Sequence, residues 1–199
     1  MRIAFDGEMA ARDSGARGKD SRVLIASLAG RFPDSSFDVY IRGKKENVLL
    51  KPLLDYPNVR LCRPEHPVLR HFPALWERFG MARELKRRGT DVFHGLDDRL
   101  PCGIRKSGAV RSAVSVHDLS FLSGSRDCSW LERHRLNIRV RSSVRKADII
   151  VASSDDTARD VVKYYFIPKQ KIAVPCPEGS GGDRLADKMM EIYRGLAGR

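Results

Sequence analysis

Short apolar runs alternate with amphipathic stretches along this chain, and this alternation leaves few folds open to it. Residues 147–152 (ADIIVA) are almost wholly apolar, as expected of a parallel strand buried on both faces. Strand-forming residues also cluster at 2–6, 37–41, 58–62, 91–96, 109–116 and 171–174. Helical spacing of apolar residues spans 23–32, capped by Asp20 or Ser21, then 73–89, 130–146, and a stretch capped by Ser153 or Ser154 that Pro168 closes. The pattern predicts a Rossmann-like, doubly wound α/β fold with a mainly parallel sheet and helices on both faces.

Bulk properties suit one soluble domain with anionic partners. The chain has 199 residues and no apolar run of the roughly 20 residues that a membrane span needs. Its first residues lack the sections of an export signal, so we expect a cytoplasmic protein. The four cysteines are widely spaced, which predicts no zinc site and no disulfide. A formal charge of +12 attracts nucleic acid, phosphorylated substrates or an acidic lipid surface without choosing among them.

The stretch 130–146 concentrates part of this charge beside an apolar stripe. A solvated helix face is one explanation. Attachment to an acidic membrane at the inner membrane face, or to a phosphorylated lipid acceptor, is the other. Aromatic residues that could stack on bases are few, so nucleic acid is not an expected partner. The predicted membrane or anion contacts are Arg133, Arg139, Arg141, Arg145 and Lys146.

A glycine-containing loop follows the first predicted strand. Gly15 and Gly18 could hold an anion through free backbone N–H groups at a helix entrance, with Arg17 or Lys19 adding charge. The loop is not a Walker A motif, because Asp13 and Asp20 stand where a glycine and a hydroxyl residue are required. A simple flexible turn is the alternative.

Two histidines end predicted strands at the edge where ligands of parallel sheets collect. His117, followed by Asp118, can exchange protons or bind a substrate hydroxyl, or it can hold the loop backbone. His94 ends the neighbouring run. The three residues together raise the alternative of a metal-dependent hydrolase, but a metal site needs further ligands, and we expect no metal.

Five segments in order resemble the N-terminal domain of GT-B glycosyltransferases of the group 1, mannosyltransferase-like bacterial kind. The resemblance covers residues 1 to about 175. The segments are MRIAFDG, FDVYIR, DVFHGLDDRLP, AVSVHDLSFL and ADIIVASSDDTARDVVKYYFIPKQKIAV. The resemblance implies a Rossmann-like domain, here 1–175, that binds the acceptor and faces a second such domain across a cleft.

In full-length relatives that second domain grips the nucleotide-sugar donor and supplies two glutamates eight positions apart. No glutamate pair in this chain has that spacing, and only 25 residues follow Val174. The stretch 184–199 resembles the family's C-terminal helix, which crosses back onto the N-terminal domain, and 176–183 reads as a glycine-rich linker. We therefore expect one half of a GT-B enzyme, inactive or nearly so alone.

The resemblance assigns His117 as the catalytic residue near the transferred sugar. It matches Gly15 and Gly18 to the family's glycine loop and places His94 on the acceptor side, although this loop lacks the family's glycine pair followed by an aromatic residue. Together with Lys19 and Asp118, which the reading of the residues adds, these are the predicted substrate-binding residues. The implied partners are a glycan or lipid-linked acceptor, and a separate donor domain or a second copy to complete the cleft. No cofactor is expected beyond the donor that the missing domain would bind. The alternative function is a non-catalytic module for polyanions or acidic membranes.

Overall fold

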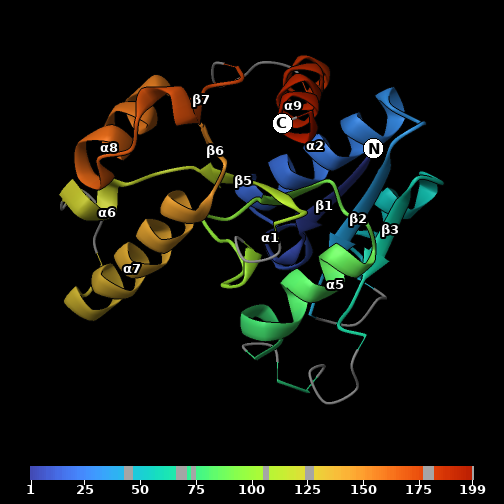
Figure 1. Ribbon diagram of the computed structural model, residues 1–199, viewed down its shortest axis with the longest axis horizontal. Coiled ribbons are helices and arrows are strands. Elements are labelled where there is room, and N and C mark those ends of the chain that lie inside the picture. Colours follow the sequence, from blue (N-terminus) through green and yellow to red (C-terminus); the bar gives the residue numbers. More distant parts are fainter. Residues whose placement is uncertain are drawn as a thin grey trace.

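The computed structural model describes residues 1–42, 47–65, 71–72, 75–104, 108–123, 128–176 and 182–198. Its centre is a seven-stranded parallel sheet in the order β3-β2-β1-β4-β5-β6-β7 (Figure 1). The chain reverses its direction of sheet growth between β1 and β4, which places the topological switch point there. The strands are β1 (Arg2–Asp6), β2 (Ser36–Tyr40), β3 (Val59–Cys62), β4 (Val92–Gly95), β5 (Arg111–Val116), β6 (Ile149–Ala152) and β7 (Ile172–Ala173).

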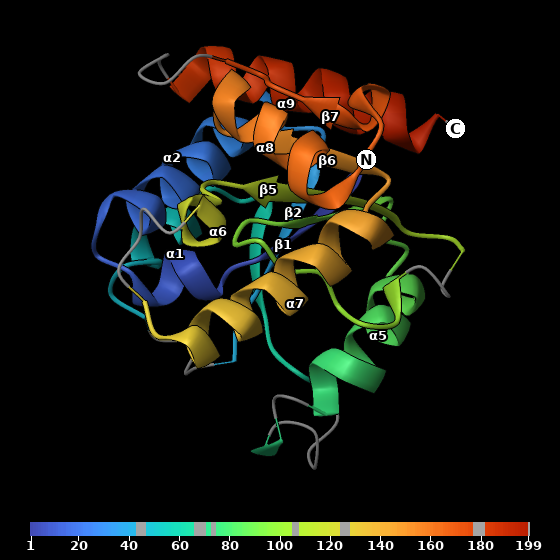
Figure 2. The same cartoon turned by 90° about the vertical axis from the view of Figure 1, so that its left-hand side faces the viewer.

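Helices cover both faces of this sheet, which confirms the predicted Rossmann-like architecture (Figure 2). Because side chains alternate along a strand, Ile3 and Phe5 of β1 enter one core and Ala4 enters the other. The first core is closed by α2 (Ala16–Arg31) and α9 (Gly182–Ala197). The second is closed by α5 (Met81–Arg87), α7 (Trp130–Lys146) and α8 (Asp155–Tyr165).

Local signals explain where α7 and α8 begin and end. Ser129 caps α7 by accepting from the backbone N–H of Glu132, and Ser154 caps α8 by accepting from Thr157. Helix α8 ends at Phe166, which has a φ of 56° and lies in the left-handed region. The remaining short elements are α1 (Glu8–Arg12), η1 (Lys51–Asp55), η2 (Trp76–Gly80), α6 (Ser120–Ser123) and η4 (Lys169–Lys171).

Two sequence predictions of helices are corrected. Helix α2 begins at Ala16 with Gly15 as its N-cap, so neither Asp20 nor Ser21 caps it. The charged residues before Val23 hid this start, because they interrupt the apolar period. The predicted helix over 73–89 is divided into a π-helical turn, η2, and the α-helix α5, and its residues 73 and 74 lie outside the described part.

Helix α9 packs along α2 and completes the first core. Its buried side chains are Ala186, Met189, Met190, Tyr193 and Leu196. On the surface, Arg31 of α2 holds Asp187 with two hydrogen bonds of 2.8 Å. Most of the predicted linker, 177–181, lies outside the described residues. Among the helices that are described, none is long and apolar enough to cross a membrane.

Candidate functional site

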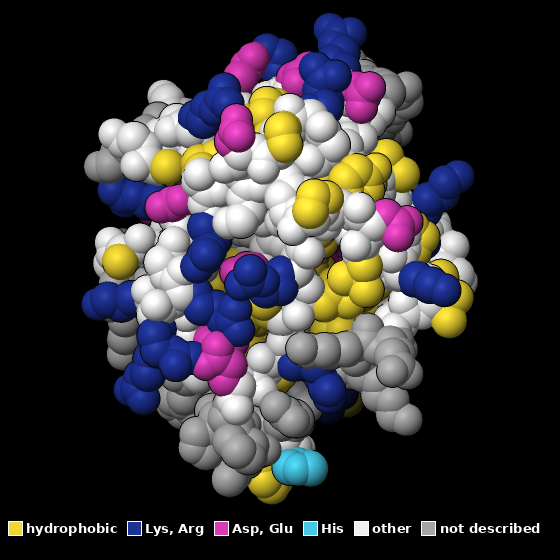
Figure 3. All heavy atoms as spheres, turned by 90° about the vertical axis from the view of Figure 1, so that its right-hand side faces the viewer, with side chains coloured by type: hydrophobic (Ala, Val, Ile, Leu, Met, Phe, Trp, Pro, Cys, Tyr) yellow, Lys and Arg dark blue, Asp and Glu magenta, His cyan; other side chains and the backbone are white. Residues whose placement is uncertain are grey.

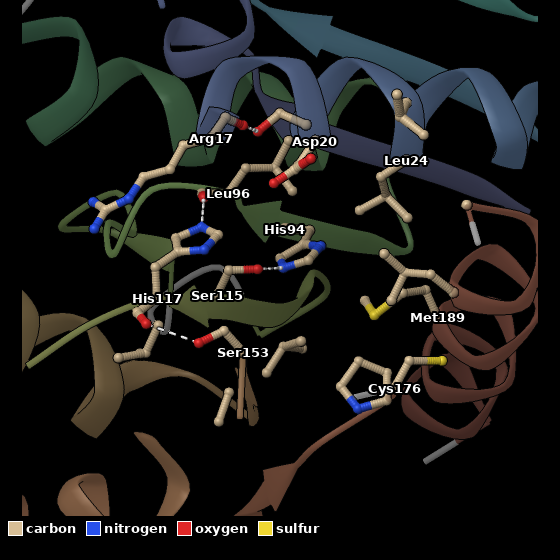
Figure 4. A pocket seen from close by; sticks show the side chains of 18 residues that line it. Arg17, Asp20, Leu24, His94, Leu96, Ser115, His117, Ser153, Cys176 and Met189 are labelled. Carbon is tan, nitrogen blue, oxygen red and sulfur yellow. Dashed lines mark hydrogen bonds between the residues drawn. The ribbon is translucent and has the colours of Figure 1, made fainter. Parts of the chain in front are cut away.

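A pocket of about 640 Å³ opens at the carboxyl edge of the sheet (Figure 4). Arg17 and Asp20 project from α2 on one side of it, and His117 and Ser115 at the end of β5 line the other. Met189 of α9 closes the pocket. Its remaining wall comes from the residues that follow β6 and β7, among them Ser153, Pro175 and Cys176.

The side chain of His117 is held in a defined orientation. Its Nε2 lies 2.9 Å from the carbonyl oxygen of Leu96. Because a carbonyl oxygen can only accept, Nε2 carries the proton and donates it. In the neutral ring Nδ1 is then an acceptor, and the described residues offer it no hydrogen-bond partner. The geometry leaves this nitrogen for a ligand.

The backbone of His117 is fixed as firmly as its ring. Its carbonyl oxygen accepts from Ser153 Oγ at 2.8 Å and from Thr157 Oγ1 at 3.3 Å, both from the start of α8. Its N–H donates to the buried carboxylate of Asp98 at 3.4 Å. Burial raises the pKa of Asp98, and the neighbouring His117 opposes part of that rise. Asp98 itself has a φ of 50°, a strained value for a residue other than glycine.

His94 lies behind the pocket wall, without exposed surface, in a chain of three hydrogen-bonded side chains. Its Nδ1 lies 2.7 Å from Tyr193 Oη and its Nε2 lies 2.9 Å from Ser115 Oγ. Burial, together with the smaller effect of the charge of His117, lowers the pKa of His94 to about 3, so the ring is neutral at pH 7.

The direction of this chain follows from the burial of Tyr193. Its O–H has no other acceptor among the described residues, and leaving a buried donor unpaired costs about 1–3 kcal/mol. Tyr193 therefore donates to Nδ1, and Nε2–H of His94 donates to Ser115. The hydroxyl proton of Ser115 is then left to face the pocket, where it can donate to a ligand oxygen.

The predicted anion loop differs from expectation in one respect. The carboxylate of Asp13 already accepts from the N–H of Gly15 at 2.7 Å and from that of Gly18 at 3.1 Å. These bonds lower the pKa of Asp13, the bond from Gly15 most. An external anion would have to displace this carboxylate. Of the loop, the pocket is lined by Arg17, not by the glycines or by the exposed Lys19.

A family model described as Glycosyltransferase Family 4 matches residues 21–175, which is more than half of the chain. The chain belongs to glycosyltransferase family 4. This confirms the resemblance to GT-B glycosyltransferases, while the mannosyltransferase-like subtype stays a prediction. No curated protein matches the family 4 chain.

Solved structures share the fold of this family 4 chain. The lipopolysaccharide outer core galactosyltransferase WaaB in its apo form has a TM-score of 0.54 and 17% identity over 90% of this chain. A glycosyltransferase from Rickettsia africae ESF-5 has a TM-score of 0.54 and 16% identity over 87% of it. Anabaena Alr3699/HepE, in complex with UDP and glucose, has a TM-score of 0.51 and 12% identity over 87%. The family 4 chain covers only 50%, 42% and 43% of these proteins, respectively.

The structure distributes the predicted site residues over several places. His117 and His94 come together in the pocket, the latter behind its wall. Asp118 binds Ser120 through both carboxylate oxygens, at 2.7 Å to its N–H and 2.6 Å to its hydroxyl, and so orders the start of α6. Within the described ranges, no three His, Cys, Asp or Glu side chains form a group that could hold a metal ion.

Sequence reasoning missed two residues that line the pocket, Ser115 and Ser153, and the buried Tyr193, which holds His94. Ser115 and Ser153 lie one position from strand ends, and Tyr193 lies on a helix far along the chain. A serine in or next to a strand carries no local signal that it lines a pocket. No periodic pattern in the sequence indicates that Tyr193 contacts His94. The alternation in VSVH was the one available signal for Ser115, since it places Ser115 and His117 on the same face of the strand.

Proposed function

We propose that this chain is the acceptor-side half of a sugar-nucleotide-dependent glycosyltransferase, which transfers a hexose to a glycan or a lipid-linked acceptor. The observation that carries the proposal is His117 in a pocket at the carboxyl edge of the sheet, where its Nδ1 has no hydrogen-bond partner among the described residues. Family membership supports transfer of a sugar, and a related fold bound to UDP and glucose supports a nucleotide-sugar donor.

The pocket groups fit one part of this chemistry. Glycosyl transfer develops positive charge on the sugar and negative charge on the leaving diphosphate, and groups placed beforehand around these charges lower the barrier. Through Nδ1, His117 can accept a hydrogen bond from a sugar hydroxyl, Ser115 can donate to a ligand oxygen, and Arg17 can face an anionic group. These groups form one wall, so we expect little turnover until a second donor-binding domain supplies the other.

Radiolabelled nucleotide sugars test this function directly. The chain is incubated with UDP-glucose, UDP-galactose or GDP-mannose and a lipid or glycan extract, alone and with a separately expressed donor domain. We expect transfer only in the mixture, and loss of at least about 100-fold in the mixture with His117→Ala. Turnover by the chain alone would contradict the proposal that it is one half of the enzyme.

A second candidate function is attachment to an acidic membrane through α7. Trp130 is 77% exposed, Ile138 56% and Leu131 48%, and the arginines at 135, 141 and 145 are exposed on the same helix. Exposed apolar residues flanked by arginines suit the interface of an anionic bilayer. Charge alone does not single out α7, because lysines and arginines are spread over another face of the molecule too, interleaved with acids (Figure 3).

Vesicle binding separates this candidate from a merely solvated helix. We expect binding to vesicles with phosphatidylglycerol that weakens steeply with salt, and at least about tenfold weaker binding for Arg141→Ser with Arg145→Ser. Trp130→Ala should weaken binding without changing its salt dependence. Equal retention of all variants would exclude α7 as the membrane contact.

A further inference from the structure

A second pocket, of about 340 Å³, lies on the opposite face of the sheet from α2 and α9. It opens between α5 and α7 beside the end of β1, next to the switch point of the sheet. Ligands of open α/β sheets collect at such points. Apolar side chains form part of its lining, namely Met81, Leu100, Pro101 and Ile138. We call this the α5–α7 pocket.

Two cations of α7 line the α5–α7 pocket. Arg139 and Lys146 lie seven positions apart, close to two helical turns, which puts them on the same side of the helix with Ser142 between them. Neither forms an ion pair within the described part of the chain. The Nε of Arg139 is also buried there without a hydrogen-bond partner. Arg139 influences the carboxylate of Asp98, whose pKa it lowers, but the two are not in ion-pair contact.

The other charges of the α5–α7 pocket largely cancel. Arg99 donates to Glu77 at 3.0 Å, and Glu77 also pairs with Arg42. With Asp6 ionised, the lining therefore carries an excess of positive charge, which attracts an anion.

Asp6 supplies an acceptor in the lining of the same pocket. It ends β1 and is only 8% exposed. One carboxylate oxygen accepts from the N–H of Glu8 at 3.2 Å, and the second takes no hydrogen bond from the described residues. A buried carboxylate with an unused oxygen is costly unless a donor reaches it. Hydroxyl groups are donors of the required kind.

The frame around these groups is rigid. The N–H of Leu100 donates to Ser143 Oγ at 3.0 Å, and Ser143 in turn donates to the carbonyl oxygen of Arg139 at 3.0 Å. The loop that carries Arg99 is thus tied to the turn of α7 that carries Arg139. These bonds fix the backbone on two sides of the pocket relative to each other, which reduces the ordering that a small ligand has to impose.

We propose that the α5–α7 pocket binds an anionic sugar, with its phosphate or carboxylate on Arg139 and Lys146 and its hydroxyls on Asp6. The apolar lining contacts the C–H face of the ring, and the size of the pocket is at the lower end for small-molecule sites, about 300 Å³ and above. This inference requires neither a nucleotide donor nor a transfer reaction. In the proposed enzyme, an anionic sugar bound here would belong to the acceptor.

Titration calorimetry at low salt tests the pocket with glucose 6-phosphate, glucuronate, glucose and inorganic phosphate as probes. We expect one of the two anionic sugars to bind saturably and more tightly than either glucose or phosphate. Arg139→Gln with Lys146→Gln should weaken that binding at least about tenfold. Arg141→Gln with Arg145→Gln removes the same charge from the exposed face of the same helix and should change it less than about twofold.

Two further measurements make the assignment specific. Asp6→Asn removes the acceptor for the hydroxyls together with one negative charge, so it should weaken binding of the sugar without weakening binding of phosphate. In the unsubstituted chain, amide resonances of residues 99, 100, 102 and 138–146 should shift on titration, which tests the site even if a variant fails to fold. Equal losses in both double variants, shifts confined to other regions, or absence of saturable binding by either anionic sugar would overturn the proposal. Failure of nucleotide-sugar turnover would leave it standing, because none of these readouts requires transfer.

Discussion

At the scale of single residues, one hydroxyl connects the C-terminal helix to the wall of the His117 pocket. Tyr193→Phe removes the donor to His94 Nδ1 and leaves a buried acceptor unpaired. We expect a loss of about 1–3 kcal/mol in the free energy of unfolding, measured by urea denaturation. Tyr164→Phe, at a partly exposed position of α8, should cost less than about 0.5 kcal/mol. Equal costs would mean that the hydrogen bond is not the cause.

A second residue stores backbone strain. Phe166 is 85% exposed and adopts a φ of 56° at the end of α8, a conformation that costs about 1–2 kcal/mol for a residue with a Cβ. We expect Phe166→Gly to raise the free energy of unfolding by about 0.5–1 kcal/mol, after the entropy of glycine is subtracted. Phe166→Ala keeps the Cβ and should change little. A gain with alanine as large as with glycine would assign the effect to the exposed ring instead.

At the scale of elements, two glycines of α2 should respond to alanine with opposite signs. A Cβ on Gly18 would lie 2.0 Å from the carbonyl oxygen of Asp13, so the helix and the preceding loop cannot keep their contact. A Cβ on Gly30 would make an ordinary contact with Tyr56. We expect Gly18→Ala to destabilise the protein by at least about 1 kcal/mol, and Gly30→Ala to stabilise it by up to about 1 kcal/mol. Thermal unfolding of the two variants measures both effects, and a shared sign would contradict the predicted packing.

Helix α9 is part of the first core and is not an appendage. Met189 is buried against that core, so Met189→Ala should cost about 2–5 kcal/mol. Glu191→Ala, on the exposed side of the same helix, should cost less than about 0.5 kcal/mol. If α9 unfolds together with the domain, amide exchange should accelerate in α2 as well as in α9 of the methionine variant. Faster exchange in α9 alone would show that the helix opens independently.

At the scale of the whole molecule, buried ionisable groups give stability a composite pH dependence. The pKa of His94 falls from 6.5 to about 3 on folding. As the pH falls from 6.5 toward 3, the unfolded chain therefore takes up a proton that the folded chain does not, and the free energy of unfolding decreases. Burial raises the pKa of Asp6 from 3.8 to about 6, which has the opposite effect as the pH falls below 6. The two contributions partly cancel in the unsubstituted protein.

Replacing the histidine separates these contributions. The cost of His94→Gln should shrink as the pH falls from 7 to 5, by at most about 1.4 kcal/mol for each pH unit below 6.5. Urea denaturation at pH 7, 6 and 5 measures it, with His134→Gln on the exposed surface of α7 as the control. A cost that does not change with pH would show that His94 is not neutral and buried as described.

Local patterns were sufficient to predict the strands, the parallel sheet and most helices. Residues 147–152 indicate a central strand, because a strand buried on both faces shows no alternation of apolar and polar residues. Ser154 indicates the start of α8, because its hydroxyl accepts a hydrogen bond from a free backbone N–H of the first turn. The start of α2 and the short α1 escaped prediction, since both lie in a charged stretch without an apolar period. The edge of the sheet that carries His117 was also predictable, because parallel strands all end on one side.

What the sequence determined by itself was the repeating strand and helix order, and with it the fold, since each of those signals acts over a few neighbouring residues. Only the tertiary structure decided which side chains meet. It put Tyr193 on His94 across 99 positions, brought Arg139, Lys146 and Asp6 to the lining of one pocket, and gave the N–H groups of Gly15 and Gly18 to Asp13. Such pairings depend on helix rotation and on the distance between layers, which follow from the packing of the whole core and leave no periodic trace along the chain.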